Sequence, residues 1–177
     1  MKRFIALVLV MLMTLSLAAC GGEESNDNPT SSQPGNATPE ANSKYVPAYK
    51  GCKLPMNADF APLLASLGDP DSYFEAASCA FDGLDKTYTY AGLEIVTYPD
   101  GDVDRISSVR ILNNSVSTPE GMTIGSSLAD VTAAYGEGYE ELGLQHAYED
   151  GDTIFSVLFE DGAAISVEYI AINDLLG

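Results

Sequence analysis

The stretch TIFSVLFEDGAAISVEYIAI, residues 153–172, decides the fold. Apolar and polar side chains alternate along it on both sides of the pair Asp161-Gly162. Alternation with a period of two is typical of a strand with one buried face, and Asp-Gly between two such runs is a strong hairpin signal. We therefore expect two antiparallel strands, at 153–160 and 163–172, joined by a tight turn.

The chain beyond residue 44 shows the same kind of pattern elsewhere. Alternating runs rich in Tyr, Ile, Val and Thr predict six further strands, at residues 73–81, 86–91, 93–99, 104–112, 139–142 and 144–149. Two shorter segments have helical spacing and end at Gly68 and Gly136, a residue type that is common just after a helix. Ser127 and Asp130 match a capping box at the start of the second helix.

Each predicted helix is followed by four predicted strands, which indicates an internal duplication. We therefore expect an α+β fold of two tandem units, each a short helix or helix pair packed on a four-stranded antiparallel sheet. The units would span residues 44–112 and 122–177, joined by a linker at 113–121.

The N-terminus has the three parts of a secretory signal peptide. Lys2 and Arg3 come before an apolar run of about 14 residues, which is shorter than the roughly 20 residues that a membrane-spanning helix needs. Small residues and Cys20 follow, so we expect residues 1–19 to be removed. Residues 20–43 are almost entirely polar and cannot bury enough apolar surface to stay ordered, which predicts a flexible tether.

The stretch Leu17-Ala18-Ala19-Cys20 resembles the bacterial lipobox. The resemblance implies that the chain is cut before Cys20, that the Cys20 sulfur takes a diacylglycerol group, and that the new N-terminus is acylated, for example with palmitate. Several acyl chains on one residue give stable anchoring. The resemblance therefore implies a lipoprotein of the cell membrane that faces outside the cytoplasm. A retained transmembrane helix and an ordinary secreted protein are the alternatives.

Residues 119–139, PEGMTIGSSLADVTAAYGEGY, resemble the opening of β-lactamase-inhibitory-protein-like domains, and are similar to small outer-membrane-assembly lipoproteins of the SmpA/OmlA type. The matching positions are Gly121, Met122, Thr123, Val131 and Gly136. Residues 78–99 also resemble a group of Firmicutes lipoproteins. The inhibitor-like family implies tandem helix-plus-sheet units and a sheet surface that grips another protein.

Acidic residues dominate the charge of the chain. It has 26 acidic and 8 basic residues, a formal net charge of −18 at pH 7, and loss of Lys2 and Arg3 with the leader would make it about −20. A surface of this sign repels phosphate backbones, which excludes nucleic acid as a partner. The expected attraction is to a protein with a basic surface, or to cations. The alternative is that the acidity serves solubility alone.

Cys52 and Cys79 are the only cysteines besides Cys20. Two cysteines in an exported domain predict one disulfide. The alternative is a pair of buried free thiols. Neither cysteine has a catalytic pattern around it.

No pattern in the sequence predicts an enzyme, a cofactor or a metal site. Asp100, Asp102 and Asp104 lack the Gly and Glu that a calcium loop needs at its sixth and twelfth positions, and they fit a hairpin turn. His146 is the only histidine, and no nucleophile or second metal ligand accompanies it in the sequence. We expect a protein that is not an enzyme and binds no cofactor.

Tyrosine is the remaining signal of function. The chain has 10 Tyr and no Trp, and tyrosine is favoured at protein interfaces. We expect Tyr88, Tyr90, Tyr98 and Tyr148 to be contact residues; the alternative is that they pack under the helices. The expected function is a membrane-anchored, non-enzymatic module that binds a protein of basic surface through its sheet. Binding of a small ligand and a purely structural role in the envelope are the alternatives.

Overall fold

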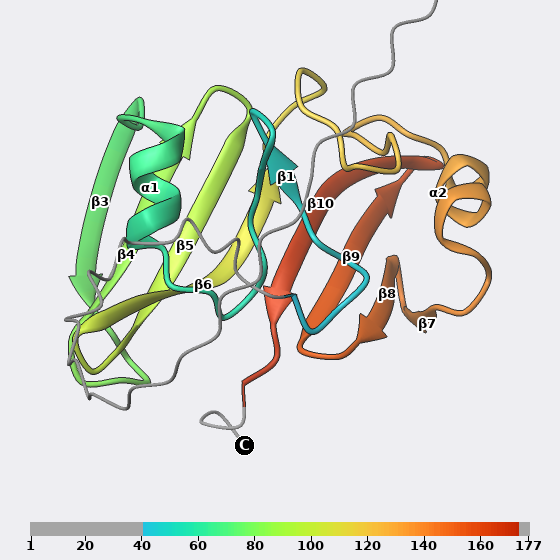
Figure 1. Cartoon of the computed structure of the whole chain (residues 1–177). Helices are drawn as coiled ribbons and strands as arrows, with labels where there is room; N and C mark the ends of the chain where they lie inside the picture. The colour runs from blue at the N-terminus through green and yellow to red at the C-terminus, as the bar shows by residue number, and fades with distance from the viewer. Residues whose placement is uncertain (1–40, 174–177) are drawn as a thin grey trace, which may run out of the picture. The chain divides into compact units, whose positions relative to one another are not determined.

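The computed structural model describes residues 41–173. This part of the chain contains two short helices, a large antiparallel sheet and a two-stranded ribbon (Figure 1). The elements in chain order are β1 (Ala48–Tyr49), β2 (Cys52–Lys53), α1 (Ala61–Leu67), β3 (Ser72–Ala77), β4 (Leu84–Tyr90), β5 (Leu93–Asp100), β6 (Val103–Ile111), α2 (Leu128–Tyr135), β7 (Glu140–Leu142), β8 (Gln145–Asp150), β9 (Thr153–Glu160) and β10 (Ala163–Ala171).

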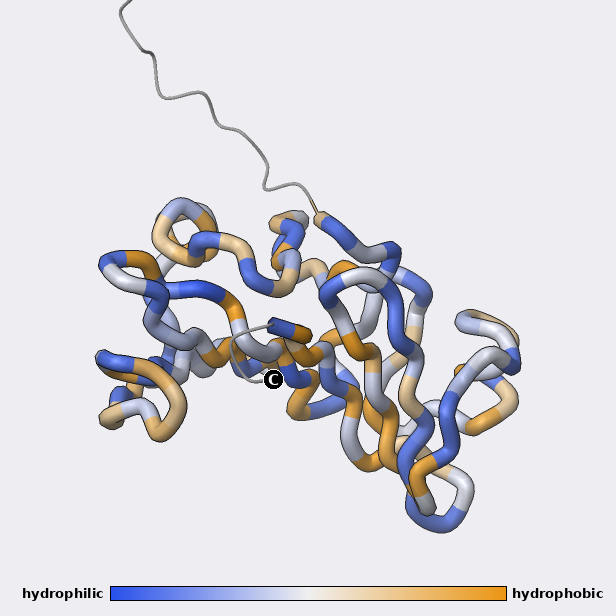
Figure 2. The backbone as a smooth tube through the Cα atoms, turned by 90° about the horizontal axis from the view of Figure 1, so that it is seen from below, coloured by the Kyte–Doolittle hydropathy of each residue, from blue (hydrophilic) through white to orange (hydrophobic). Residues whose placement is uncertain are grey.

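The large sheet has eight strands in the order β3-β4-β5-β6-β10-β9-β8-β7. Every neighbouring pair is antiparallel, and most neighbours are joined by tight turns. The one long connection runs from β6 through α2 to β7, and β6 pairs with β10, with Val109 opposite Tyr169. Figure 2 shows hydrophobic and hydrophilic residues alternating along the strands, as expected for a sheet with two different faces.

The expected fold class is wrong. The described part of the chain is mostly β: its helices have only 7 and 8 residues, and the eight strands form one sheet rather than two units that each pack a helix on four strands. The physical reason lies in β6 and β10, which would each leave a row of unpaired backbone groups at an edge. Pairing between them satisfies both rows. Alternation in the sequence predicts a strand, but it does not identify the strand beside it.

One face of the sheet is covered and forms the core. Residues directly opposite one another on adjacent strands point to the same face. Tyr88, Ile95, Val109, Tyr169 and Phe155 are successive partners across five strands, and none of them is more than 6% exposed. This row therefore marks the covered face.

α1 and the chain before it cover the strands β4 to β6. The ring of Phe60 lies 4.7 Å from the ring of Tyr88, and Leu67 is buried at the end of the helix. The N–H of Asn57 donates to the C=O of Ile106 at 2.9 Å, which holds this segment against β6. Figure 1 shows α1 in front of the sheet, on the side that also carries the segment from β1 to β2.

α2 covers β8 and β9 on the same face. The ring of Tyr135 stacks on Phe155 with 4.2 Å between ring centroids, and Tyr45 packs against Tyr135 at 5.8 Å. The predicted capping box is confirmed: the Ser127 hydroxyl accepts from the N–H of Asp130, and the Asp130 carboxylate accepts from the N–H of Ser127. Both helices and the N-terminal segment thus occupy one face of the sheet.

Candidate binding face

The four tyrosines that were expected at the surface are core residues. Tyr88, Tyr90, Tyr98 and Tyr148 are 6%, 3%, 5% and 1% exposed, so they offer little contact area to a partner. The reason is their register: Tyr88, Tyr90 and Tyr148 point to the covered face, under the helices. Tyr98 is covered by Phe81, whose ring stacks on it at 4.8 Å.

Two of these tyrosines connect the sheet to the ends of the helices. The Tyr90 hydroxyl donates to the C=O of Gly68 at 3.1 Å, and the Tyr148 hydroxyl donates to the C=O of Gly136 at 3.0 Å. Carbonyls at a helix C-terminus lack partners within the helix, so each bond satisfies such a group. Burial raises the pKa of Tyr90 and raises the pKa of Tyr148 to about 12. Both phenols therefore remain protonated donors at neutral pH.

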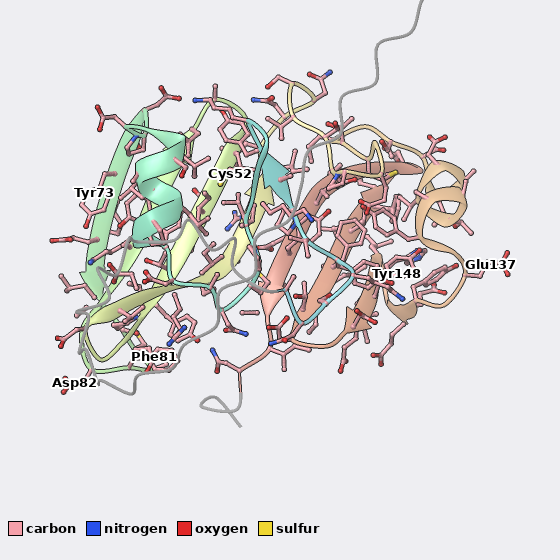
Figure 3. The ribbon with its side chains drawn as sticks, in the orientation of Figure 1. Cys52, Tyr73, Phe81, Asp82, Glu137 and Tyr148 are labelled. Carbon is pink, nitrogen blue, oxygen red and sulfur yellow. The ribbon has the colours of Figure 1, made fainter. Side chains whose placement is uncertain are left out.

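The expected disulfide between Cys52 and Cys79 is not formed. Both are free thiols, with Cys52 half-buried in β2 and Cys79 exposed in the loop between β3 and β4. Figure 3 places Cys52 at one end of the sheet and Phe81, two residues after Cys79, at the opposite end. A disulfide needs Cα atoms within about 7 Å, which this separation does not allow. Cys20, the expected lipid attachment site, lies outside the described residues.

Asp104, beside the acidic turn, and His146 both make contacts that stabilise the fold. Asp104 forms a salt bridge with Lys86 at 2.6 Å, and this hydrogen bond raises the pKa of the Lys86 ammonium group. His146 is buried and its ring stacks on Tyr139 with 4.1 Å between centroids. Within residues 41–173, no group of three or more His, Cys, Asp or Glu side chains is placed to hold a metal ion.

The opposite face of the sheet, which we call the open face, carries neither helix, because α1 and α2 both pack on the covered face. Its central row contains Thr87, Val96, Ser108, Ile170 and Ile154, which are successive partners across β4, β5, β6, β10 and β9. The open face comprises this row and the side chains of Phe74, Asp85, Thr89, Glu94, Arg110, Glu168, Ser156, Ala147, Glu149, Glu140, Leu158, Gln145 and Leu142.

A charged strip crosses the middle of the open face. Glu94, Arg110 and Glu168 lie directly opposite one another on β5, β6 and β10. The Arg110 Nη2 atom is 3.2 Å from Glu94 Oε1, and its Nε atom is 3.6 Å from Glu168 Oε1. One positive charge is thus shared between two carboxylates, and the strip remains negative.

Two hollows meet on the open face at Ile170. The first has a volume of about 370 Å³ and lies between the β3–β4 loop and the strands β5, β6 and β10, with Phe81 and Val96 in its wall. The second has a volume of about 290 Å³ and lies over β8, β9 and β10, with Ile154 and Leu142 in its wall. Among the described residues that line them, every charged one is acidic, namely Asp85, Glu168, Glu140 and Glu149. The arrangement therefore combines apolar walls with a negative rim.

Sequence reasoning missed the open face because it chose contact residues by their type. The available signal was the phase of the alternation. Once the positions with the most apolar side chains are assigned to the core, the residues between them must point the other way. Val96, Ile154 and Ile170 are apolar residues in that second phase, and such residues are the informative ones on a face that neither α1 nor α2 covers.

Comparison of the chain with protein-family models, with curated proteins and with solved structures found no match. In the part of the chain that the structure describes, no helix has the length and apolar character needed to cross a bilayer.

Proposed function

We propose that this protein is a membrane-anchored, non-enzymatic module whose open face binds another protein of basic surface. The observation that carries the proposal is the pair of hollows that meet at Ile170, whose walls are apolar and whose charged lining, as far as residues 41–173 supply it, is acidic. Lys and Arg side chains have an apolar stem and a cationic end. Such side chains complement both parts of this surface.

The open face also exposes more apolar side chains than is usual for a sheet face in contact with water. Leu142 is 53% exposed, and Val96, Ile154, Leu158 and Ile170 are half-buried although they lie on the face that carries neither α1 nor α2. Contiguous exposed apolar residues rimmed by polar ones mark interaction sites. Because these residues stand on paired strands, they form a rigid surface whose ordering costs little entropy on binding.

The charge of the whole chain supports the same partner chemistry. A formal net charge of −18 attracts a basic protein over distances of about a Debye length, roughly 8 Å at physiological salt. Charge complementarity of this kind mainly raises the association rate. Binding should therefore weaken as the salt concentration rises.

The membrane anchor is the part of the proposal that rests on the sequence alone. The lipobox resemblance at Leu17-Ala18-Ala19-Cys20 supports lipid attachment to Cys20. Converting Cys20 to Ala should move the protein from the detergent phase to the aqueous phase in a phase-partitioning assay. A Cys20→Ala protein that still enters the detergent phase would refute the anchor without affecting the binding proposal.

Site-specific photo-cross-linking in intact cells tests the binding face. A photoreactive amino acid is placed at Ile154 or Ile170 on the open face and, as a control, at Leu128, which is 38% exposed on α2. We expect one protein to be cross-linked from both open-face positions and not from Leu128. If the same protein is captured equally well from Leu128, or none is captured from Ile154 and Ile170, the open face is not a protein-binding surface.

A further inference from the structure

The two edges of the eight-stranded sheet differ in how they are protected. β7, at one edge, has three residues, two of which are Glu. β3, at the other edge, has six residues, and Glu75 is its only charged one. Natural sheets protect their edges with short strands, charges, Pro and bulges. β7 has the first two of these features, whereas β3 is long and carries one charge.

β3 is also regular and exposed along its whole length. All six of its residues are exposed, and its register with β4 contains no bulge. Phe74 is 65% exposed on the open face, and Tyr73 is 49% exposed on the other face. Figure 3 shows Tyr73 at the outer border of the ribbon. Among residues 41–173, no strand pairs with the outer edge of β3, so the strand presents aromatic side chains together with free backbone groups.

The hydrogen bond from the N–H of Ser78 to the C=O of Gly83, at 3.0 Å, identifies which backbone groups are free. Bonded and non-bonded pairs alternate in an antiparallel ladder. Counting back along the register, Phe74 and Ala76 direct their N–H and C=O groups to β4. Tyr73 and Glu75, together with Ala77, direct theirs to the free edge.

We propose that β3 pairs antiparallel with β3 of a second copy of this chain, about a two-fold axis at Phe74. In this register Tyr73 of each copy forms a hydrogen-bonded pair with Glu75 of the other, using the free backbone groups. The two Phe74 side chains then face each other in a non-bonded pair, where side chains approach most closely. The two sheets would join edge to edge, with both open faces on the same side.

The side chains of β3 select this register over its neighbours. Moving the axis to Glu75 places Glu75 directly opposite Glu75 of the second copy, and moving it to Tyr73 places Glu75 opposite Asp71. Both arrangements are unfavourable for like charges. Moving it to Ala76 removes Phe74 and Tyr73 from the overlap. With the axis at Phe74, an aromatic pair forms on one face. On the other face, Glu75 lies opposite Tyr73, a residue whose hydroxyl already donates to Glu75 within the strand.

Electrostatics oppose this association, because each copy has a formal net charge of −18. Salt screens that repulsion, so self-association should strengthen as salt rises. Binding of a basic partner to the open face should show the opposite response. The pairing of β3 does not rest on the function proposed above, and the two proposals can fail separately.

Sedimentation velocity of the full chain with Cys20→Ala, over a range of protein and salt concentrations, measures the pairing. The test variant is Phe74→Lys and the control is Leu144→Lys, because these side chains are 65% and 66% exposed and both changes add the same charge. We expect a dimer that strengthens with salt, an increase of about tenfold or more in its dissociation constant for Phe74→Lys, and little change for Leu144→Lys. A monomer at every salt concentration, or equal effects of the two variants, would overturn the proposal.

Disulfide trapping tests the register and does not depend on the folding of Phe74→Lys. Phe74→Cys is compared with Glu75→Cys, each in a chain whose native cysteines are replaced by Ala. Non-bonded partners have Cα atoms about 4.5 Å apart, within the range for a disulfide. Phe74→Cys should give a covalent dimer on mild oxidation, and Glu75→Cys should not. Equal trapping of the two, or no trapping of Phe74→Cys, would rule out the axis at Phe74.

Discussion

At the scale of single residues, neighbouring positions on one strand point to opposite faces of the sheet, so one side chain lies in the core and the next lies at the surface. Phe155 is fully buried among aromatic rings, with Tyr135 stacked on it at 4.2 Å and Tyr169 at 4.9 Å. Ile154, its neighbour in the chain, points to the open face and lines a hollow there. The two residues are both apolar, but they have different structural roles.

Replacing Phe155 by Ala should therefore lower the free energy of unfolding by about 3–5 kcal/mol, because it leaves a cavity in the core. Ile154→Ala should cost no more than about 1 kcal/mol, since its site is open to solvent. Urea denaturation of both variants measures the difference. Equal losses would mean that the two faces of the sheet are wrongly assigned.

Ionisation of buried tyrosines should lower the free energy of unfolding at alkaline pH. Burial raises the pKa of Tyr148 to about 12, whereas a tyrosine in an unfolded chain titrates near 10. Between these pH values the Tyr148 phenol loses its proton in the unfolded chain before it does so in the folded one. Its contribution to the free energy of unfolding is therefore complete below about pH 10 and is lost as pH rises toward 12. Tyr148→Phe should reduce the fall in unfolding free energy over this range. An unchanged slope would show that Tyr148 is not buried as described.

The two free thiols make a prediction of their own. Reduction with dithiothreitol should leave the melting temperature unchanged, because Cys52 and Cys79 are not joined. A thiol reagent should modify the exposed Cys79 first, since Cys52 is half-buried and burial raises its pKa. A drop in the melting temperature on reduction would instead support the disulfide between Cys52 and Cys79 that the sequence predicts.

At the scale of the elements, the sequence was sufficient to predict a motif whose hydrogen bonds all lie between residues close in the chain. The capping box at Ser127 and Asp130 was readable from the sequence because its contacts lie within one turn of helix. The strand expected at 73–81 ends earlier, at Ala77, because the Ser78 hydroxyl accepts from the N–H of Phe81 and turns the chain. β1 and β2 were not expected, since strands of two residues are too short to show a period.

The cap of α2 can be tested directly. Ser127→Ala should lower the free energy of unfolding by about 1 kcal/mol, because it removes the acceptor for the N–H of Asp130. Ser117→Ala, at an exposed loop position, is the matched control and should have almost no effect. The comparison uses the midpoint of urea unfolding followed by circular dichroism. Equal shifts for the two variants would argue against the capping box.

At the scale of the whole described chain, the sequence lacked the one piece of information that determines the sheet. Strand alternation and Asp-Gly turns predicted hairpins between consecutive strands, which are local. The pair β6–β10 joins Val109 to Tyr169 across about 60 residues of sequence, and no local pattern reports such a contact. The open face follows from that long-range pair, because its hollows meet at Ile170 on β10, beside β6. Contact residues chosen by residue type alone were therefore the buried tyrosines and not the residues of the open face.

The most direct test of the open face uses the purified partner that is cross-linked from Ile154 and Ile170. Its affinity is measured for the unchanged chain, for Ile170→Lys and for the control Leu128→Lys, at several salt concentrations. Ile170→Lys places a cation where the two hollows meet, so we expect the dissociation constant to rise about tenfold or more, corresponding to about 1.4 kcal/mol. Leu128→Lys should change it little, and the affinity of the unchanged chain should fall with salt. Equal affinities for all three proteins would contradict binding on the open face.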